Sequence, residues 1–300
     1  MSPEKLKTIQ QRIKQLDTIP TVPAVIQPLM QLLQKPAEDI RLDQLKNLVS
    51  YDKAIAAQCL RMANSPLFGR RSVETVGDAV VALGTKRIQS IVISCSLNRL
   101  VDPKKSAFDP EIFWRHSLGC ALVTRKMAQA IGYPDPEKAY LAGLLHDIGI
   151  LVNSIVCAEE FRECTRWAAS VCMALHKAEE QRLGFNHCQS GKILADHWHL
   201  PEDLTSVIEF HHYAQSATNA PELVSLVHLS DLLCRVRELG YGYYEVMGID
   251  LAGEEAWGVL VERYQKLARM DLARFTMDID GAMTDIVALV NSVFSGNASV

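Results

Sequence analysis

Apolar residues recur every three or four positions along most of the chain, which is the spacing of one face of an α-helix. The stripe of Leu29, Met30 and Leu33 is one such face, and we expect it to lie in the core. Strand-like alternation is scarce, since even the β-prone run Ile91-Val92-Ile93 lies within a helical pattern. The pattern therefore predicts an all-α protein.

Aspartate followed by proline marks the start of two predicted helices. Aspartate caps the helix, and proline suits its first turn because the missing N–H would have no partner there. Asp109-Pro110-Glu111 opens a helix predicted to continue through Ile131. Asp135-Pro136-Glu137 opens the next helix, which is predicted to carry the pair His146-Asp147 near its end.

The polar, turn-rich stretch Val101-Asp102-Pro103-Lys104-Lys105 is the strongest candidate for a domain boundary. It predicts a smaller helical lobe over residues 1–104 and a second helical domain, with C-terminal helices, over residues 105–300. A length of 300 residues with 48% apolar content is sufficient for a sizeable core.

Composition narrows the class of protein. The net charge of -4 gives no overall attraction to nucleic acid, and the first five residues, Met1 to Lys5, lack a hydrophobic signal region. No apolar run is judged to approach the roughly 20 residues of a membrane span. The eight cysteines contain no Cys-x-x-Cys pair, so we expect reduced thiols packed as small hydrophobic groups, without a zinc site of their own. These features predict a cytoplasmic protein.

The pair His146-Asp147, behind Leu144-Leu145, carries the clearest chemical signal. Neighbouring side chains on a helix point about 100° apart, so both can reach one cation only where the helix meets the site edge-on. Imidazole and carboxylate groups are ligands that first-row divalent metals favour. Further groups of these kinds lie along the chain: His116, His187, His211, His212 and Asp231.

Additional motifs flank this pair in a fixed order. They are Ile19-Pro20-Thr21-Val22-Pro23-Ala24-Val25, Asp52 with Leu60-Arg61-Met62-Ala63-Asn64-Ser65, Asp78-Ala79-Val80 with Ala82-Leu83-Gly84, Phe113-Trp114-Arg115-His116, Ala142 to Gly149, His187 with Gly191 and Leu194-Ala195, Trp198-His199-Leu200-Pro201, and His211-His212. From Ile19 to His212 the chain thereby resembles the HDOD family, the HD-related output domains of bacterial signalling proteins. The resemblance implies an HD-domain-like helical bundle behind a smaller N-terminal helical lobe, and a regulatory role.

The wider HD superfamily consists of metal-dependent phosphohydrolases, including the HD-GYP phosphodiesterases that cleave cyclic di-GMP. Similarity to those enzymes implies one or two divalent metal ions (Fe, Mn, Ni or Zn), and makes Asp147 the candidate catalytic residue. The implied ligands of one metal are His116, His146, Asp147 and Asp231, and those of the other are His187, His211 and His212, with Asp147 bridging the two.

Two departures from the enzymes argue against catalysis, and a third limits the number of metals. Ile150 stands where they have a lysine that offers positive charge to a phosphate. The segment from Tyr213 to Ala217 replaces the Gly-Tyr-Pro signature, and Ile112 stands where some members carry a glutamate for a third metal. The resemblance therefore implies two metals at most.

A simpler reading is a buried polar network satisfied by hydrogen bonds alone. Burying seven such groups without a metal would be costly, which favours metal binding. His176, His197 and His199 are expected to be ordinary core or surface histidines. His228, three residues before Asp231, is a candidate partner behind the site.

Two functions remain. The first is a signalling module that binds a partner protein or a nucleotide and has little or no hydrolytic turnover. The second is a metal-dependent phosphohydrolase acting on a nucleotide or cyclic dinucleotide. Ile150 and the missing Gly-Tyr-Pro favour the first. No receiver or sensor domain is recognisable in the sequence, so the input is expected from a separate partner.

Overall fold

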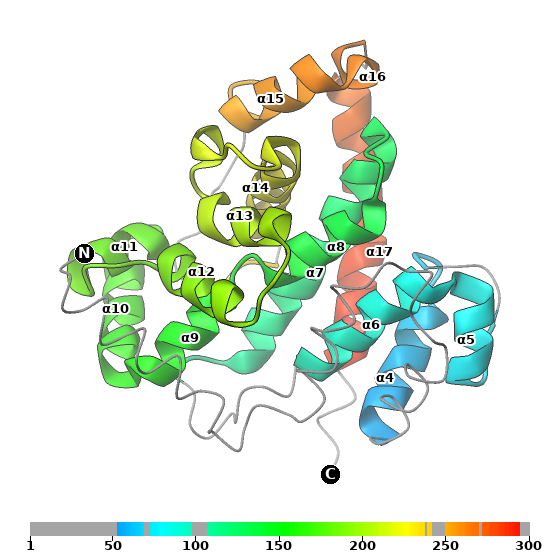
Figure 1. The fold of residues 1–300 in the computed structure, drawn as a ribbon, viewed down its shortest axis with the longest axis horizontal. Coiled ribbons are helices and arrows are strands. Elements are labelled where there is room, and N and C mark those ends of the chain that lie inside the picture. The colour runs from blue at the N-terminus through cyan, green and yellow to red at the C-terminus, as the bar shows by residue number, and fades with distance from the viewer. Residues whose placement is uncertain are drawn as a thin grey trace.

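The computed structural model describes residues 53–68, 72–97, 107–237, 239–241, 250–269 and 272–294. All regular structure in these ranges is helical, which confirms the all-α prediction (Figure 1). The elements are α4 (Lys53–Ala63), α5 (Val76–Leu83), α6 (Thr85–Leu97), α7 (Pro110–Ile131), α8 (Pro136–Leu145), α9 (Ile148–Val156), α10 (Ala158–Ser170), α11 (Leu175–Arg182), α12 (His187–His197), α13 (Glu202–Phe210), the 3-10 helix η3 (Ala214–Ser216), α14 (Pro221–Val236), α15 (Glu255–Arg263), α16 (Gln265–Ala268) and α17 (Leu272–Phe294).

Helix α7 is the central element, and α8, α14 and α17 all pack against it (Figure 1). It begins as predicted, because the Asp109 side chain accepts a hydrogen bond from the Glu111 N–H and Pro110 occupies the first turn. It ends at Gly132, whose left-handed backbone lets its N–H bond the Ala128 carbonyl. Most of α7 is buried, so this helix can carry His116 into the interior.

The His146-Asp147 pair lies between two helices and not inside one, which corrects the sequence prediction. Helix α8 ends at Leu145 and α9 begins at Ile148. Asp147 has φ -98° and ψ 14°, and its carboxylate caps no helix N–H. The break in the helix redirects the Asp147 side chain, so that both members of the pair point into one site despite being adjacent in sequence.

Two glycines let α9 and α12 pack in close contact. A β-carbon at Gly149 would overlap the carbonyl oxygen of His187, which is backbone. A β-carbon at Gly191 would lie 3.2 Å from the backbone nitrogen of Gly149. This close packing brings His187, at the start of α12, next to the pair at the start of α9.

Helices α4, α5 and α6 pack together beside the central helices, with α6 against α8 and α4 against α17 (Figure 1). Polar contacts join them to the core: the Arg125 guanidinium lies 4.1 Å from the centre of the Phe68 ring, and Ser94 and Tyr140 share a hydrogen bond of 2.8 Å. The predicted boundary at residue 104 and the motifs before residue 53 lie outside the described residues.

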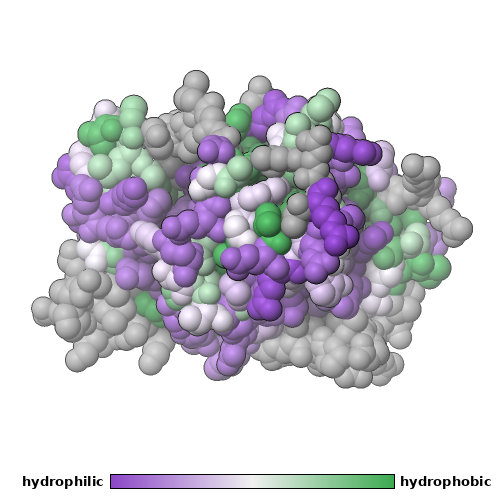
Figure 2. All heavy atoms as spheres, turned by 90° about the horizontal axis from the view of Figure 1, so that it is seen from above, coloured by the Kyte–Doolittle hydropathy of each residue, from purple (hydrophilic) through white to green (hydrophobic). Residues whose placement is uncertain are grey.

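The segment Pro136–Val156 corrects the expectation about membrane spans. Its 21 residues are long and apolar enough to cross a membrane, but 94% of the 18-residue window that meets this test is buried within the fold. It comprises α8, the His146-Asp147 junction and α9, all in the core. On the face shown in Figure 2, hydrophilic residues predominate and hydrophobic ones are scattered in small groups.

Candidate metal centre

The structure brings the seven predicted site residues together in the interior. Four of them, His116, His146, Asp147 and His211, have no exposed surface, and His187 and Asp231 are 1% exposed. They come from five parts of the fold: His116 from α7, His146 and Asp147 from the α8–α9 junction, His187 from α12, His211 and His212 from the end of α13, and Asp231 from α14.

The Asp147 carboxylate lies at the middle of the cluster, with two histidines at each oxygen. Its Oδ1 is 3.2 Å from His187 Nε2 and 3.1 Å from His211 Nε2. Its Oδ2 is 3.2 Å from His146 Nε2 and 3.6 Å from His116 Nε2. A carboxylate placed in this way can bridge two cations.

Asp231 links the two sides. Its Oδ1 is 3.1 Å from His116 Nε2, and its Oδ2 is 3.9 Å from His212 Nδ1. Arg235, one helical turn later, donates from Nε to Oδ1 at 2.8 Å. Burial alone would raise the pKa of Asp231, but Arg235 and His116 hold that pKa below its ordinary value, so this carboxylate stays charged.

Hydrogen bonds behind the histidines fix which nitrogen faces the centre. His116 Nδ1 lies 2.6 Å from the Leu239 carbonyl, and His146 Nδ1 lies 2.8 Å from the Gly143 carbonyl. A carbonyl only accepts, so in each ring Nδ1 carries the proton. When the ring is neutral, its Nε2 lone pair is therefore directed at the carboxylates.

A divalent cation fits this donor set better than hydrogen bonds do. Burial lowers the pKa of His146, so this ring stays neutral and its Nε2 is a bare lone pair facing Asp147 Oδ2. Among the described residues, neither His146 Nε2 nor Asp147 Oδ1 has a hydrogen-bond partner, although both are buried. A bound cation would satisfy both atoms, whereas the polar-network alternative leaves them unpaired.

Sequence reasoning missed three residues that hold the cluster. Buried Glu179 on α11 accepts from the His187 N–H at 2.9 Å and from its Nδ1 at 2.6 Å. Arg235 could have been found from its four-residue spacing to Asp231 on one helix. Glu179 and Tyr241 had no such signal, because their contacts join segments distant in sequence.

Two histidines outside the seven also lie at the site. His176 stacks on His212 with ring centres 4.1 Å apart, and burial lowers its pKa to about 3. His228 lies behind the cluster as expected, but it contacts a different partner: its Nδ1 is 2.7 Å from the His211 carbonyl. His228 therefore contacts the turn after α13 and does not support Asp231.

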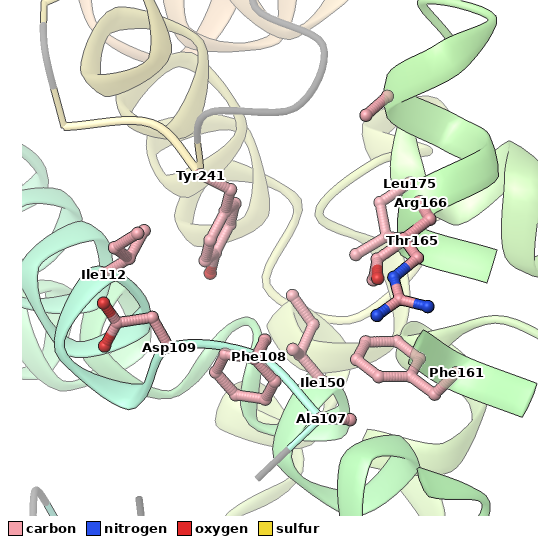
Figure 3. Close-up of a pocket in the computed structure, with 11 residues that line it drawn as sticks. Ala107, Phe108, Asp109, Ile112, Ile150, Phe161, Thr165, Arg166, Leu175 and Tyr241 are labelled. Carbon is pink, nitrogen blue, oxygen red and sulfur yellow. The ribbon is translucent and has the colours of Figure 1, made fainter. Parts of the chain in front are cut away.

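A pocket of about 270 Å³ adjoins the cluster. Tyr241 belongs to both, because its side chain lines the pocket (Figure 3) and its hydroxyl donates to Asp147 Oδ2 at 2.7 Å. Phe108 and Phe161 line the pocket as well, and Figure 3 shows the Arg166 guanidinium extending toward it. The pocket combines aromatic walls with one cation, Arg166, and one carboxylate, Asp109, and it adjoins the cluster through Tyr241.

Replacing Glu179 with glutamine is expected to weaken metal binding by about 10–100-fold, the usual effect of losing an outer partner of a ligating histidine. The neutral amide no longer holds the His187 ring as strongly as the carboxylate does. Chelator competition with zinc measures the change. Glu180→Gln is the matched control, since Glu180 is exposed and bonds Asn186 and Tyr213 instead. Equal zinc affinities for the two variants would contradict the role of Glu179.

Comparison with known proteins gives consistent matches. The model of the HDOD domain family matches residues 19–214. The fold is similar to that of an HDOD domain protein of unknown function from Geobacter sulfurreducens, with a TM-score of 0.81 and 26% identity over 97% of this chain and 98% of that one. A proposed phosphohydrolase from Shewanella amazonensis SB2B has a similar fold, with a TM-score of 0.70 and 22% identity over 93% of this chain and 97% of that one.

This chain matches less than half of the length of one curated relative. An uncharacterised protein of Treponema pallidum (strain Nichols) is 25% identical over 227 residues, which is 73% of this chain. The matched region spans 43% of that relative. A proposed signal transduction protein from Marinobacter aquaeolei VT8 shares the fold at a TM-score of 0.68 and 22% identity, over 97% of this chain and 65% of that one.

Proposed function

The chain belongs to the HDOD domain family, and we propose that it is a cytoplasmic signalling protein whose buried centre binds one or two divalent metal ions with little or no hydrolytic turnover. Its input is a signalling protein partner or a nucleotide. The eight cysteines, all free thiols, support the compartment. The metal would be held by His116, His146, Asp147, His187, His211, His212 and Asp231.

The single observation that carries this proposal is that the centre is closed. Tyr241 covers Asp147 from the pocket side, with its hydroxyl on Oδ2 at 2.7 Å and its ring centre 4.3 Å from that of His116. His212 is the most exposed of the seven residues, and its side chain is only 6% exposed. When bound, a metal would supply Lewis acidity there, but the described residues bury the cluster almost completely, which disfavours access by a phosphodiester.

The position that holds a phosphate-binding lysine in the enzymes carries no cation in this chain. Ile150 is 3% exposed and lines the pocket beside the cluster, so an apolar side chain occupies the position of the enzymes' lysine. Arg166 is the cation among the described pocket residues, and it lies on the exposed face of α10. The pocket suits binding of a small aromatic, anionic ligand such as a nucleotide better than its hydrolysis.

Metal analysis together with a phosphodiesterase assay tests the proposal. Purified protein should contain metal, and its cyclic di-GMP hydrolysis should be at least about 10²–10³-fold slower than that of an HD-GYP enzyme, because a positioned cationic donor is missing. Metal-free protein after expression in metal-supplemented medium would contradict the metal centre. Fast hydrolysis would contradict the regulatory role.

The alternative is a metal-dependent phosphohydrolase acting on a nucleotide or cyclic dinucleotide. The observation that favours it is Asp147, whose two oxygens each face a separate pair of histidines, as in two-metal hydrolytic sites. Fast metal-dependent hydrolysis that is lost in Asp147→Ala would select this function.

A further inference from the structure

Two cysteines lie within the candidate metal centre. Cys120 is one helical turn after His116 on α7, and its Sγ lies 3.4 Å from His116 Nε2. Cys188 follows His187 on α12, and its Sγ lies 3.9 Å from both ring nitrogens of His211. Both thiols are buried and free. From the sequence alone, both are expected to be ordinary core cysteines.

Each thiol completes a compact set of four donors. Within a set, one donor atom from each residue lies within 4.8 Å of the other three. A tetrahedral zinc ion, with Zn–S near 2.3 Å and Zn–N near 2.0–2.1 Å, separates sulfur from nitrogen by about 3.5 Å, close to the separations found here. The first set is His116, Cys120, His146 and Asp231, and the second is His187, Cys188, His211 and His212.

Building on the metal centre proposed above, we infer that Cys120 and Cys188 are metal ligands, one on each side of Asp147. Each side carries an independent sign of a missing cation. His146 Nε2 in the first set is fully buried and has no hydrogen-bond partner in the described chain. On the second side the same holds for Asp147 Oδ1, the oxygen that faces His187 and His211.

Sulfur ligation gives the centre a different chemistry from a nitrogen and oxygen site. Thiolates prefer zinc and other thiophilic ions to manganese or magnesium. With Asp147 shared between the two sides, each set would offer five protein donors and leave no position free, whereas catalytic sites keep one position open. Each thiol releases its proton to solvent when the metal binds. A filled shell accounts for slow turnover independently of Ile150.

Cobalt(II) binding tests this inference without any activity assay. Cobalt bound by thiolate shows a sulfur-to-metal charge-transfer band in the near ultraviolet. The wild type should show it, Cys120→Ser and Cys188→Ser should each lose part of it, and the double variant should lose all of it. Cys95→Ser is the control, because Cys95 lies on α6 with its Sγ 3.8 Å from Met62 Sδ, outside both sets.

The outcomes separate this inference from the proposed function. Wild-type protein that binds cobalt without the band overturns the sulfur ligands but leaves the metal centre standing. A single variant that loses the whole band overturns one of the two ligands. Protein that binds no cobalt overturns both proposals. If circular dichroism shows that a serine variant is unfolded, the matching alanine variant gives the same readout. Zinc affinity of each folded variant should fall by at least about 10–100-fold.

Discussion

Replacing Asp147 with alanine is expected to empty the metal centre while the helices stay folded. Asp147 is the group that all four inward-facing histidine nitrogens share, at 3.1–3.6 Å. Without its charge, the centre loses its bridge and the anion that offsets two cations. Elemental analysis of the purified variant should find little metal, and its far-ultraviolet circular dichroism should match the wild type.

Thermal melting is a second measurement of whether the variant still binds metal. A metal that binds only the folded state stabilises it by about 2.7 kcal/mol at 100 times its dissociation constant. Wild-type protein should therefore melt at a lower temperature in chelator, and Asp147→Ala should melt at one temperature with or without zinc. Asp196→Ala is the control, since that exposed carboxylate pairs with Lys192 at the surface. If Asp147→Ala contained as much metal as the wild type, the proposed centre would be contradicted.

Gly149→Ala is expected to destabilise the fold and to weaken metal binding together. The added methyl group would overlap the His187 carbonyl, and neither backbone can yield without separating α9 from α12. Overpacking of this kind costs about 1–3 kcal/mol or more. At about 2–4 °C per kcal/mol, the melting temperature should drop measurably even in chelator. His187 would move away from Asp147, so zinc affinity should fall as well.

Gly258→Ala is the matched control for this substitution. Gly258 lies within α15, and a β-carbon there meets nothing within 4 Å. Alanine at such an exposed helical position should stabilise the fold by up to about 1 kcal/mol and leave zinc affinity unchanged. If Gly149→Ala melted like Gly258→Ala, the close packing of α9 on α12 would not be what positions His187.

Local sequence signals predicted what depends on local physics. Asp109 and Pro110 specify the start of α7 because a cap satisfies N–H groups only a few residues away. The same holds for Asp135, which accepts from the Lys138 N–H at the start of α8. Periodicity predicted the all-α class for a related reason, since a helix makes its backbone hydrogen bonds within one segment.

The sequence misjudged features that depend on neighbours in space. Neither His146 nor Asp147 is a proline or glycine, so the residues at the break itself did not predict that α8 would stop at Leu145. His146 and Asp147 interrupt the apolar run Pro136–Val156, so the sequence did not predict it as a possible membrane span. Packing of the fold shows that the run belongs to the core. Cys120 and Cys188 could not be told from other core cysteines by spacing alone.

By itself, then, the sequence determined the helical class, the starts of α7 and α8, and the identity of seven residues that meet in the interior. Local spacing was enough for the helical class and the helix starts, whereas the seven residues came from the resemblance to the HD enzymes. Only the tertiary structure decided that Asp147 faces two histidine pairs, that Glu179 and Tyr241 contact the cluster, and that its side chains are buried. These depend on contacts such as that between Tyr241 and Asp147, 94 residues apart, which only packing of the whole chain creates.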